Sequence, residues 1–283
     1  MATPGTLPPS INSRVDMASK QLFDPVIVDA LSSDFEAALR ESESELRPVC
    51  EISRVGEYFR VKCKKTTVLA TAQYSLAEPY PDSPGMGRFA LMLFTSQMAR
   101  PLVQAWKPRI DDKTLGRIVA RGLRQSLDLH AMRITDELVG ALNVDIQVYN
   151  ADSNLLDVAY FAADLAIRGC KKPEAPTPLQ EGGEKVRVPD LKLAESVAVT
   201  VALKAERVIR AINPALNTGV YDRFTIAFDR KFNVISAVKH YSGRGVKIST
   251  FSDVLKQADI RARRNIQVYR AARSEFLTRE QVP

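Results

Sequence analysis

Apolar residues recur at helical spacing in four parts of the chain and predict four helices. Between residues 111 and 128, apolar residues lie on one face and basic residues on the opposite face. The apolar face consists of Leu115, Ile118, Val119 and Leu123. Residues 155–167 are apolar on almost every side, so this helix is expected to be buried between other elements. The two remaining predicted helices cover residues 22–40 and 252–277.

Short runs rich in apolar residues and bounded by turn residues predict strands on both sides of a connector at 172–184. The connector is rich in proline, glycine and glutamate. Before it, strands are predicted at 49–55, 58–63, 66–74, Phe89–Thr95 and 142–149. After it, strands are predicted at 185–189, 196–203, 207–212, 223–229 and 233–239. Three prolines and two glycines make 79–87 a loop.

Both halves of the chain place strands first and a helix last, which predicts an α/β (α+β) fold of two β-α lobes with mixed sheets and packed helices. The domain prediction is a disordered tail at 1–20, a first lobe at 21–171 that includes the N-terminal helix, a linker at 172–184, and a second lobe at 185–283.

Composition excludes several classes of protein. The 283 residues are 45% hydrophobic, and no run approaches the roughly 20 apolar residues that a membrane-spanning helix needs. Three cysteines without a Cys-x-x-Cys pair and two histidines argue against a disulfide scaffold and a zinc site. The thiols are therefore expected to be buried and reduced.

The net charge of +7 is concentrated in one segment. Residues 88–133 contain nine basic and three acidic side chains, whereas residues 1–48 contain four basic and eight acidic ones. Such a segment is typical of a surface that faces an anion. A solvated exterior helix would give the same pattern, so both interpretations stay open at this stage.

Motifs of common enzymes are absent from the sequence. It contains no GxGxxG, P-loop, GxSxG or HExxH motif. His240 is either a general base or a hydrogen-bonded structural residue, and Cys170 fits a small apolar residue. The turn at Ser242–Gly245 offers backbone amides to a phosphate, although hairpins use glycine for the same backbone reason.

One long run resembles the ribonuclease PH family. Residues 115–169 combine the basic amphipathic helix, its Leu127-Asp128-Leu129 exit, the strand with VDIQVY and the buried small-residue helix, and DRFTIAF at 222–228 follows in the second half. The resemblance covers about 45–276. It implies a ribonuclease PH-like fold, assembly into hexameric rings that thread single-stranded RNA, and, in active members, phosphate-dependent cleavage of RNA 3′ ends.

The resemblance also implies that the catalytic site has degenerated. Active members follow an Ala-Asp turn with Gly-Gly-Thr-Arg-Thr, but after Ala151-Asp152 this chain has Leu156 in place of the phosphate-gripping arginine, followed by Asp157. Of the family's two aspartates six positions apart, Asp222 matches the second and Leu216 replaces the first. Leucine neither binds a metal nor moves a proton. We expect no catalytic residues, no metal and no cofactor.

The Asn-Leu-Leu-Asp run at 154–157 resembles the non-catalytic ribonuclease PH-like subunits of the RNA exosome core. This resemblance implies a hetero-hexameric ring with other such subunits, RNA-binding cap subunits, an associated catalytic nuclease and single-stranded RNA as partners. It implies residence in the nucleus, including the nucleolus, and in the cytoplasm, without a membrane. An active phosphate-dependent 3′-5′ exoribonuclease and a basic α/β RNA-binding protein of unknown assembly are the alternatives.

By the same resemblance, residues 85–109 lie near the ring pore. This predicts contacts with RNA phosphates that do not read the bases. The expected RNA-binding residues are Arg88, Arg100, Lys107 and Arg109. Arg117, Arg121 and Arg124, on the regular helical stripe, are expected to be solvated or paired with the acids of a neighbouring subunit.

Overall fold

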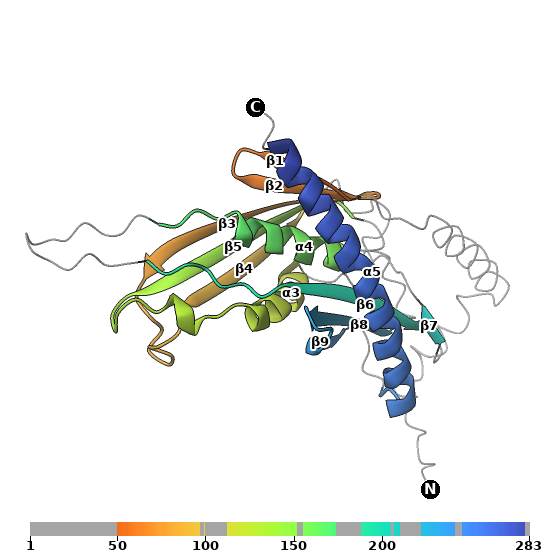
Figure 1. The fold of residues 1–283 in the computed structure, drawn as a ribbon. Helices are drawn as coiled ribbons and strands as arrows, with labels where there is room; N and C mark the ends of the chain where they lie inside the picture. The colour runs from red at the N-terminus through yellow and green to blue at the C-terminus, as the bar shows by residue number, and fades with distance from the viewer. Residues whose placement is uncertain are drawn as a thin grey trace, which may run out of the picture. The chain divides into compact units, whose positions relative to one another are not determined.

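The structure is a computed structural model that describes residues 50–96, 99, 112–151, 155–173, 188–204, 207–209, 222–240 and 245–280. Residues Pro48–Pro283 form one compact unit (Figure 1). The helix predicted over 22–40 and the tail at 1–20 lie outside the described residues, as does most of the 172–184 connector. The predicted domain boundaries therefore stay predictions.

The first sheet contains β1 (Cys50–Val55), β2 (Tyr58–Cys63), β3 (Thr66–Ala77), β5 (Val139–Asn150) and β4 (Arg88–Thr95), in that order. All neighbours are antiparallel except β4 and β5, which run parallel. Gly56 and Lys64 adopt φ values of 63° and 55° in the turns of the meander β1-β2-β3. Such values suit the tight turns between twisted strands.

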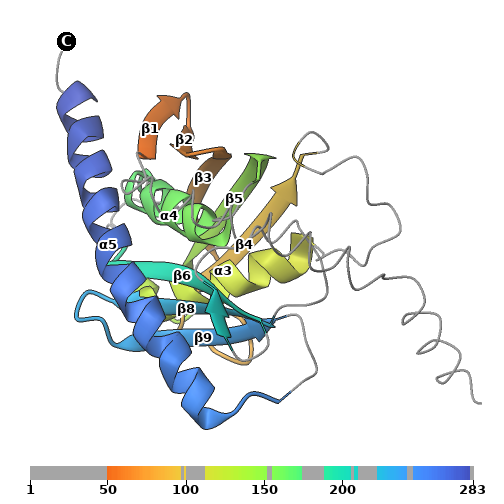
Figure 2. The same ribbon diagram turned by 90° about the vertical axis from the view of Figure 1, so that its right-hand side faces the viewer.

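The second sheet contains β7 (Arg207–Ile209), β6 (Ser196–Lys204), β8 (Asp222–Asp229) and β9 (Val234–His240), in that order and all antiparallel. Two helices lie between the sheets, α3 (Asp112–Ser126) and α4 (Leu155–Arg168) (Figure 2). A short turn of 3-10 helix, η2 (His130–Met132), precedes β5. The long helix α5 (Ile248–Glu280) runs past both sheets and contacts β6 and β1.

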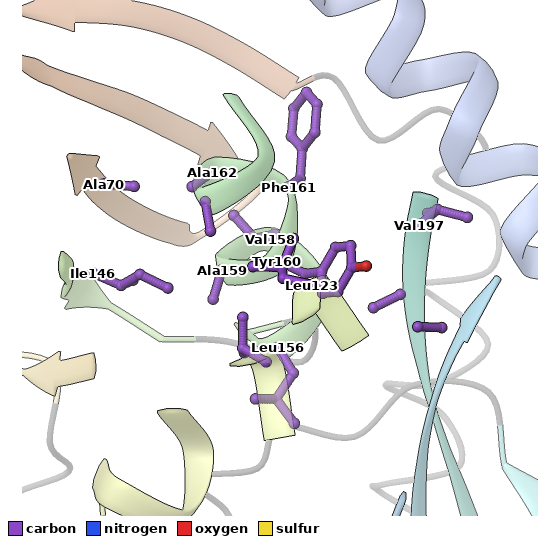
Figure 3. Close-up of a cluster of buried hydrophobic side chains, with 14 of the residues drawn as sticks. Ala70, Leu123, Ile146, Leu156, Val158, Ala159, Tyr160, Phe161, Ala162 and Val197 are labelled. Atoms are coloured by element: carbon purple, nitrogen blue, oxygen red, sulfur yellow. The ribbon is translucent and has the colours of Figure 1, made fainter. Parts of the chain in front are cut away.

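The core is built around α4. Every residue of α4 from Leu155 to Ile167 is buried, as its nearly uniform apolar sequence predicted. Figure 3 shows its side chains between the first sheet and β6, with Ala70 and Ile146 on one side and Val197 on the other. Small residues such as Ala159 and Ala162 allow α4 to pack closely against both sheets. The helix α4 therefore forms the layer that joins the two sheets.

The two-sheet α/β fold class is confirmed, and most predicted elements are present with boundaries shifted by a few residues. The strand predicted at 185–189 is wrong for Val188 and Pro189, which belong to no strand. Proline has no N–H to donate to a strand ladder, which explains this result. β5 begins at Val139, three residues earlier than predicted. Gly140 allows this, because it leaves room for the Tyr74 ring. A Cβ atom at Gly140 would lie 2.5 Å from that ring.

The prediction of reduced thiols is wrong for two of the three cysteines. Cys50 and Cys63 are buried, as expected, but they form a disulfide between β1 and β2 with Cα atoms 4.3 Å apart. The two-residue turn at 56–57 pairs Val55 with Tyr58, and the same register places Cys50 opposite Cys63. Hairpin register, and not a Cys-x-x-Cys motif, brings the two sulfurs together.

No helix in the described parts of the chain has the length and apolarity that crossing a membrane requires. Within the same residues, no three His, Cys, Asp or Glu side chains gather in a way that could hold a metal ion.

Candidate nucleic-acid interface

Helix α3 presents one apolar and one basic face, as predicted. Asp112 precedes the first full turn, and its carboxylate accepts a hydrogen bond from the Thr95 amide at 2.9 Å, which ties the helix to the end of β4. The apolar residues of α3 are buried against β4, α4 and the second sheet. Burial of this face fixes the opposite face toward solvent.

The exposed face of α3 carries Lys113, Arg117, Arg121 and Arg124. Successive members are three or four residues apart, so they form a stripe about 17 Å long on one side of the helix. None of the four forms an ion pair or hydrogen bond with another described residue. We call these four residues the α3 basic stripe. Four uncompensated cations in a row attract a polyanion.

Arg88 occupies a different environment. Its guanidinium donates to the Pro79 carbonyl at 3.3 Å and lies over the Tyr80 ring, 4.2 Å from the ring centroid. These contacts hold Arg88 against the 79–87 loop. The other predicted RNA-binding residues, Arg100, Lys107 and Arg109, lie outside the described residues. The RNA-binding role of this group therefore stays a prediction.

The start of α4 carries Leu156 and Asp157, which the sequence resemblance predicts at the phosphate-binding positions. Leu156 is 1% exposed and packs in the core. Asp157 is also 1% exposed, and its carboxylate accepts a hydrogen bond from the Thr200 amide of β6 at 2.8 Å. The Arg261 guanidinium of α5 lies 3.5 Å from the second carboxylate oxygen and donates to the Thr200 carbonyl at 3.3 Å.

The Asp157 carboxylate thus joins α4, β6 and α5 at one point. Burial raises the pKa of Asp157 above its ordinary value, and the Arg261 charge and the Thr200 hydrogen bond oppose that rise. At a phosphate site this carboxylate would bring a negative charge toward the anion. The structure instead directs it into the protein, where one oxygen accepts the Thr200 hydrogen bond and the other, which has no hydrogen-bond partner, lies 3.5 Å from the Arg261 guanidinium.

Asp222 is the first residue of β8. Its side chain is 14% exposed, and one carboxylate oxygen lies 3.4 Å from the Lys239 ammonium of β9. In the sheet register Asp222 lies opposite Leu203, while Thr200, the partner of Asp157, lies opposite Thr225. Asp222 and Thr225 are three residues apart on β8, or about 10 Å along the strand. Leu216 lies outside the described residues.

The comparisons with known proteins agree with this fold. Residues 58–173 match the model of the 3′ exoribonuclease family, domain 1. This region is therefore similar to a ribonuclease PH-like domain. The chain is 29% identical over 195 residues to the exosome complex component Rrp42 of Pyrococcus abyssi, an alignment that covers 66% of this chain and 70% of the relative.

A second relative, the exosome complex component Rrp42 of Methanocella arvoryzae, is 32% identical over 133 residues. That alignment covers 46% of this chain and half the length of the relative. The ribonuclease PH-like fold continues beyond the matched domain: an archaeal exosome core structure superimposes with a TM-score of 0.62 at 22% identity. The superposition covers 87% of this chain and 98% of the archaeal chain.

Sequence reasoning missed the partners of Asp157. Thr200 and Arg261 lie 43 and 104 residues further along the chain, and no local pattern links them to α4. The α3 basic stripe, in contrast, was visible as a helical repeat of basic residues. The expected exposure of Arg117, Arg121 and Arg124 is confirmed, and their pairing with the acids of a neighbouring subunit stays a prediction.

Proposed function

We propose that this chain is a non-catalytic ribonuclease PH-like subunit of an RNA exosome core ring, which supports 3′-5′ RNA processing by scaffolding the ring and contacting single-stranded RNA. The observation that carries the proposal is the α3 basic stripe: a rigid, solvent-facing row of cations on a ribonuclease PH-like domain whose expected phosphate-binding arginine is replaced by the buried Leu156.

The start of α4 supports the non-catalytic part of the proposal. Leu156 has no donor for a phosphate, and the buried Asp157 carboxylate already faces the Thr200 amide and the Arg261 guanidinium. An anion approaching this point would meet an apolar side chain and a buried carboxylate. Neither stabilises the negative charge that develops on phosphate during phosphorolysis.

The α3 basic stripe supports the RNA contact. Single-stranded RNA is bound without regard to sequence by cations that follow its backbone, and each contact adds to the salt dependence of binding. A helix supplies such cations at fixed intervals, because its apolar face is anchored in the core. Arg88, Arg100, Lys107 and Arg109 extend this surface in the proposal.

Exposed apolar side chains on the first sheet support assembly with other subunits. Met92 and Phe94 of the edge strand β4 are 54% and 52% exposed, and Tyr149 of neighbouring β5 is 46% exposed. The proposed partners are other ribonuclease PH-like exosome subunits in a hetero-hexameric ring, with RNA-binding cap subunits and an associated catalytic nuclease. The nucleus and the cytoplasm are the proposed locations.

A salt titration of RNA affinity tests the RNA contact. The variant Arg117→Gln/Arg121→Gln/Arg124→Gln should weaken binding of an oligouridine by the assembled ring and flatten the slope of log affinity against log salt by about two, at about 0.7 per lost contact. The matched control Arg60→Gln/Lys65→Gln/Arg264→Gln removes three exposed cations elsewhere and should keep the slope. An unchanged slope in the α3 variant would contradict the proposal.

The variant Arg88→Ala/Arg100→Ala/Arg109→Ala, in the same titration, tests the residues predicted from sequence. A loss of about two in the slope is expected here as well. If only this variant changes the slope, RNA follows the 85–109 segment and not α3.

Incubation of the purified chain with single-stranded RNA and inorganic phosphate tests the absence of catalysis. We expect no nucleoside diphosphates, and Asp222→Asn should leave phosphate-dependent turnover by the assembled complex unchanged. Release of nucleoside diphosphates by the isolated chain would favour the alternative, an active phosphate-dependent 3′-5′ exoribonuclease. A loss of turnover in the Asp222→Asn ring with assembly intact would show that Asp222 serves a site shared with a neighbour.

A further inference from the structure

A polar pocket lies at the carboxyl end of α4, the end opposite to Leu156 and Asp157. Its volume is about 370 Å³, within the range of pockets that hold a small ligand or one or two side chains. It is formed by β3, the end of α4, the segment before β6, and α5. The lining residues are Tyr74, Ile167, Arg168, Cys170, Lys172, Asp190, Leu191, Leu193 and Arg273.

The cations of this pocket differ in the hydrogen bonds and ion pairs that they already form with other residues. Arg168 forms a two-pronged pair with the buried Asp164, at 2.8 and 3.0 Å, and donates to the Ala194 carbonyl. Lys172 pairs with Asp190, but both side chains are about half exposed or more, so this pair rearranges at little cost. Arg273 makes no hydrogen bond or ion pair with any described residue.

The surrounding surface adds further positive charge. Lys171 and Lys192 are exposed beside the lining residues. Asp190 is the only acid among the described residues that line the pocket, and Lys172 pairs with it. A ligand that enters therefore meets the half-buried Arg273 guanidinium, which interacts with the Asp164 charge but forms no hydrogen bond with a described residue. A guanidinium binds a carboxylate through two parallel hydrogen bonds.

The remaining lining residues are apolar or neutral. Leu191, Leu193 and the buried Ile167 supply aliphatic surface. The Cys170 thiol donates to the Ala72 carbonyl at 3.1 Å, and burial raises its pKa. It is consequently a neutral donor that does not repel an anion. The Tyr74 ring is packed over Gly140 and is only 6% exposed.

We propose that this pocket docks a short acidic peptide segment of a partner protein, with an aliphatic or aromatic side chain against Leu191 and Leu193 and a carboxylate on Arg273. The combination of an aliphatic wall with one uncommitted guanidinium matches a segment in which apolar and acidic residues are adjacent. The proposal adds a second surface to the chain and does not depend on RNA binding by α3.

The character of the walls favours a peptide over RNA. Single-stranded RNA is held by aromatic faces on which bases stack, together with a row of cations along the backbone. Here Tyr74 offers almost no ring surface, and the aliphatic walls provide no stacking platform. The pocket is also compact, whereas the α3 basic stripe is an open row that suits a polymer backbone.

A fluorescence anisotropy titration of the full chain tests the proposal. The probe is the fluorescein-labelled peptide Asp-Glu-Phe-Leu-Asp-Glu, and the control probe carries serine in place of its phenylalanine and leucine. We expect saturable binding of the first probe, with affinity reduced about tenfold or more by Arg273→Gln and by the loss of the two apolar residues. Arg264→Gln removes an equally charged, exposed residue of the same helix and should leave the affinity unchanged.

Arg273→Lys keeps the positive charge but not the two parallel N–H donors of a guanidinium. We therefore expect an intermediate loss of affinity for the first probe. Circular dichroism verifies that each variant stays folded. Absence of saturable binding by the wild-type chain, or equal affinities of Arg273→Gln and Arg264→Gln, would overturn the proposal. A third result would also overturn it. If a 12-nucleotide oligouridine displaces the probe, and Arg273→Gln weakens the binding of that oligouridine, the pocket is an RNA site.

Discussion

At the scale of single residues, Asp157 shows how one buried carboxylate can join distant elements. Its carboxylate is buried against Thr200 and Arg261. A buried ion pair is weak evidence for stability, but removal of one partner leaves the other charge without compensation. The carboxylate thus holds α4, β6 and α5 in register at the centre of the fold.

Asp157→Ala should lower the free energy of unfolding by about 3 kcal/mol, because the Thr200 amide loses its acceptor and the Arg261 guanidinium loses the opposite charge beside it. Urea denaturation followed by circular dichroism measures this change. Asp253→Ala removes a 64% exposed carboxylate that pairs with Lys256, and it should cost less than about 1 kcal/mol. Equal costs for the two variants would contradict the role given to Asp157.

The pH dependence of stability gives an independent test. Because burial raises the pKa of Asp157 above 3.8, the folded state holds this proton more tightly than the unfolded state. The contribution is complete below pH 3.8 and is lost as the pH rises through the folded pKa. Asparagine does not titrate, so the Asp157→Asn variant should not lose stability in this way. The difference in unfolding free energy between wild type and variant should therefore shrink as the pH rises from 3.8. A constant difference would contradict the raised pKa.

At the scale of elements, the two faces of α3 have different roles: the apolar face packs in the core and the basic face lies in solvent. Its apolar face positions the helix so closely that Gly122 has no room for a side chain: a Cβ there would lie 2.7 Å from the Tyr160 ring and 3.1 Å from Ala227. Gly116, six residues earlier, meets Leu93 at an ordinary distance of 3.5 Å. The close approach at Gly122 sets the direction in which the α3 basic stripe faces solvent.

The two glycines form a matched pair for mutagenesis. Gly116→Ala should stabilise the chain by about 0.5–1 kcal/mol, since alanine favours the helix and its methyl group fits. Gly122→Ala should destabilise it by about 1–3 kcal/mol, because the methyl group overlaps Tyr160. Thermal unfolding of both variants provides the measurement. Stabilisation by both substitutions would show that α3 can move away from α4 at little cost.

At the scale of the whole molecule, a ribonuclease PH-like fold is combined with apolar side chains on an open sheet face. The exposed Met92 and Phe94 lie on an edge strand, where unpaired backbone groups also favour association. A free chain would expose this surface to water, whereas a ring subunit would cover much of its surface with neighbours.

Expression should therefore depend on partners. Alone, the chain should aggregate or express poorly, and co-expression with ribonuclease PH-like subunits should yield a soluble complex, as judged by size-exclusion chromatography and native mass spectrometry. Met92→Ser/Phe94→Ser should improve solubility of the lone chain more than Val55→Ser/Tyr58→Ser, which changes two exposed residues beside the turn between β1 and β2. Equal soluble yields of the lone wild-type chain and of the co-expressed complex would contradict the expectation.

The sequence by itself determined the two faces of α3, the burial of α4 and the strands of both sheets. These features follow from local periodicity, because burying one face of a helix or strand dictates which positions are apolar. The prediction that Leu156 stands in place of a phosphate-binding arginine also needed only the order of residues in one turn.

Only the tertiary structure decided which distant residues meet. The Cys50–Cys63 bond depends on hairpin register, and the Asp157–Arg261 pair on the packing of α5 against α4 and β6. The polar pocket at the carboxyl end of α4 forms only where β3, α4, the segment before β6 and α5 meet. Such contacts depend on how layers pack in three dimensions, and the spacing of residues along one element carries no record of the side chains that approach it from another.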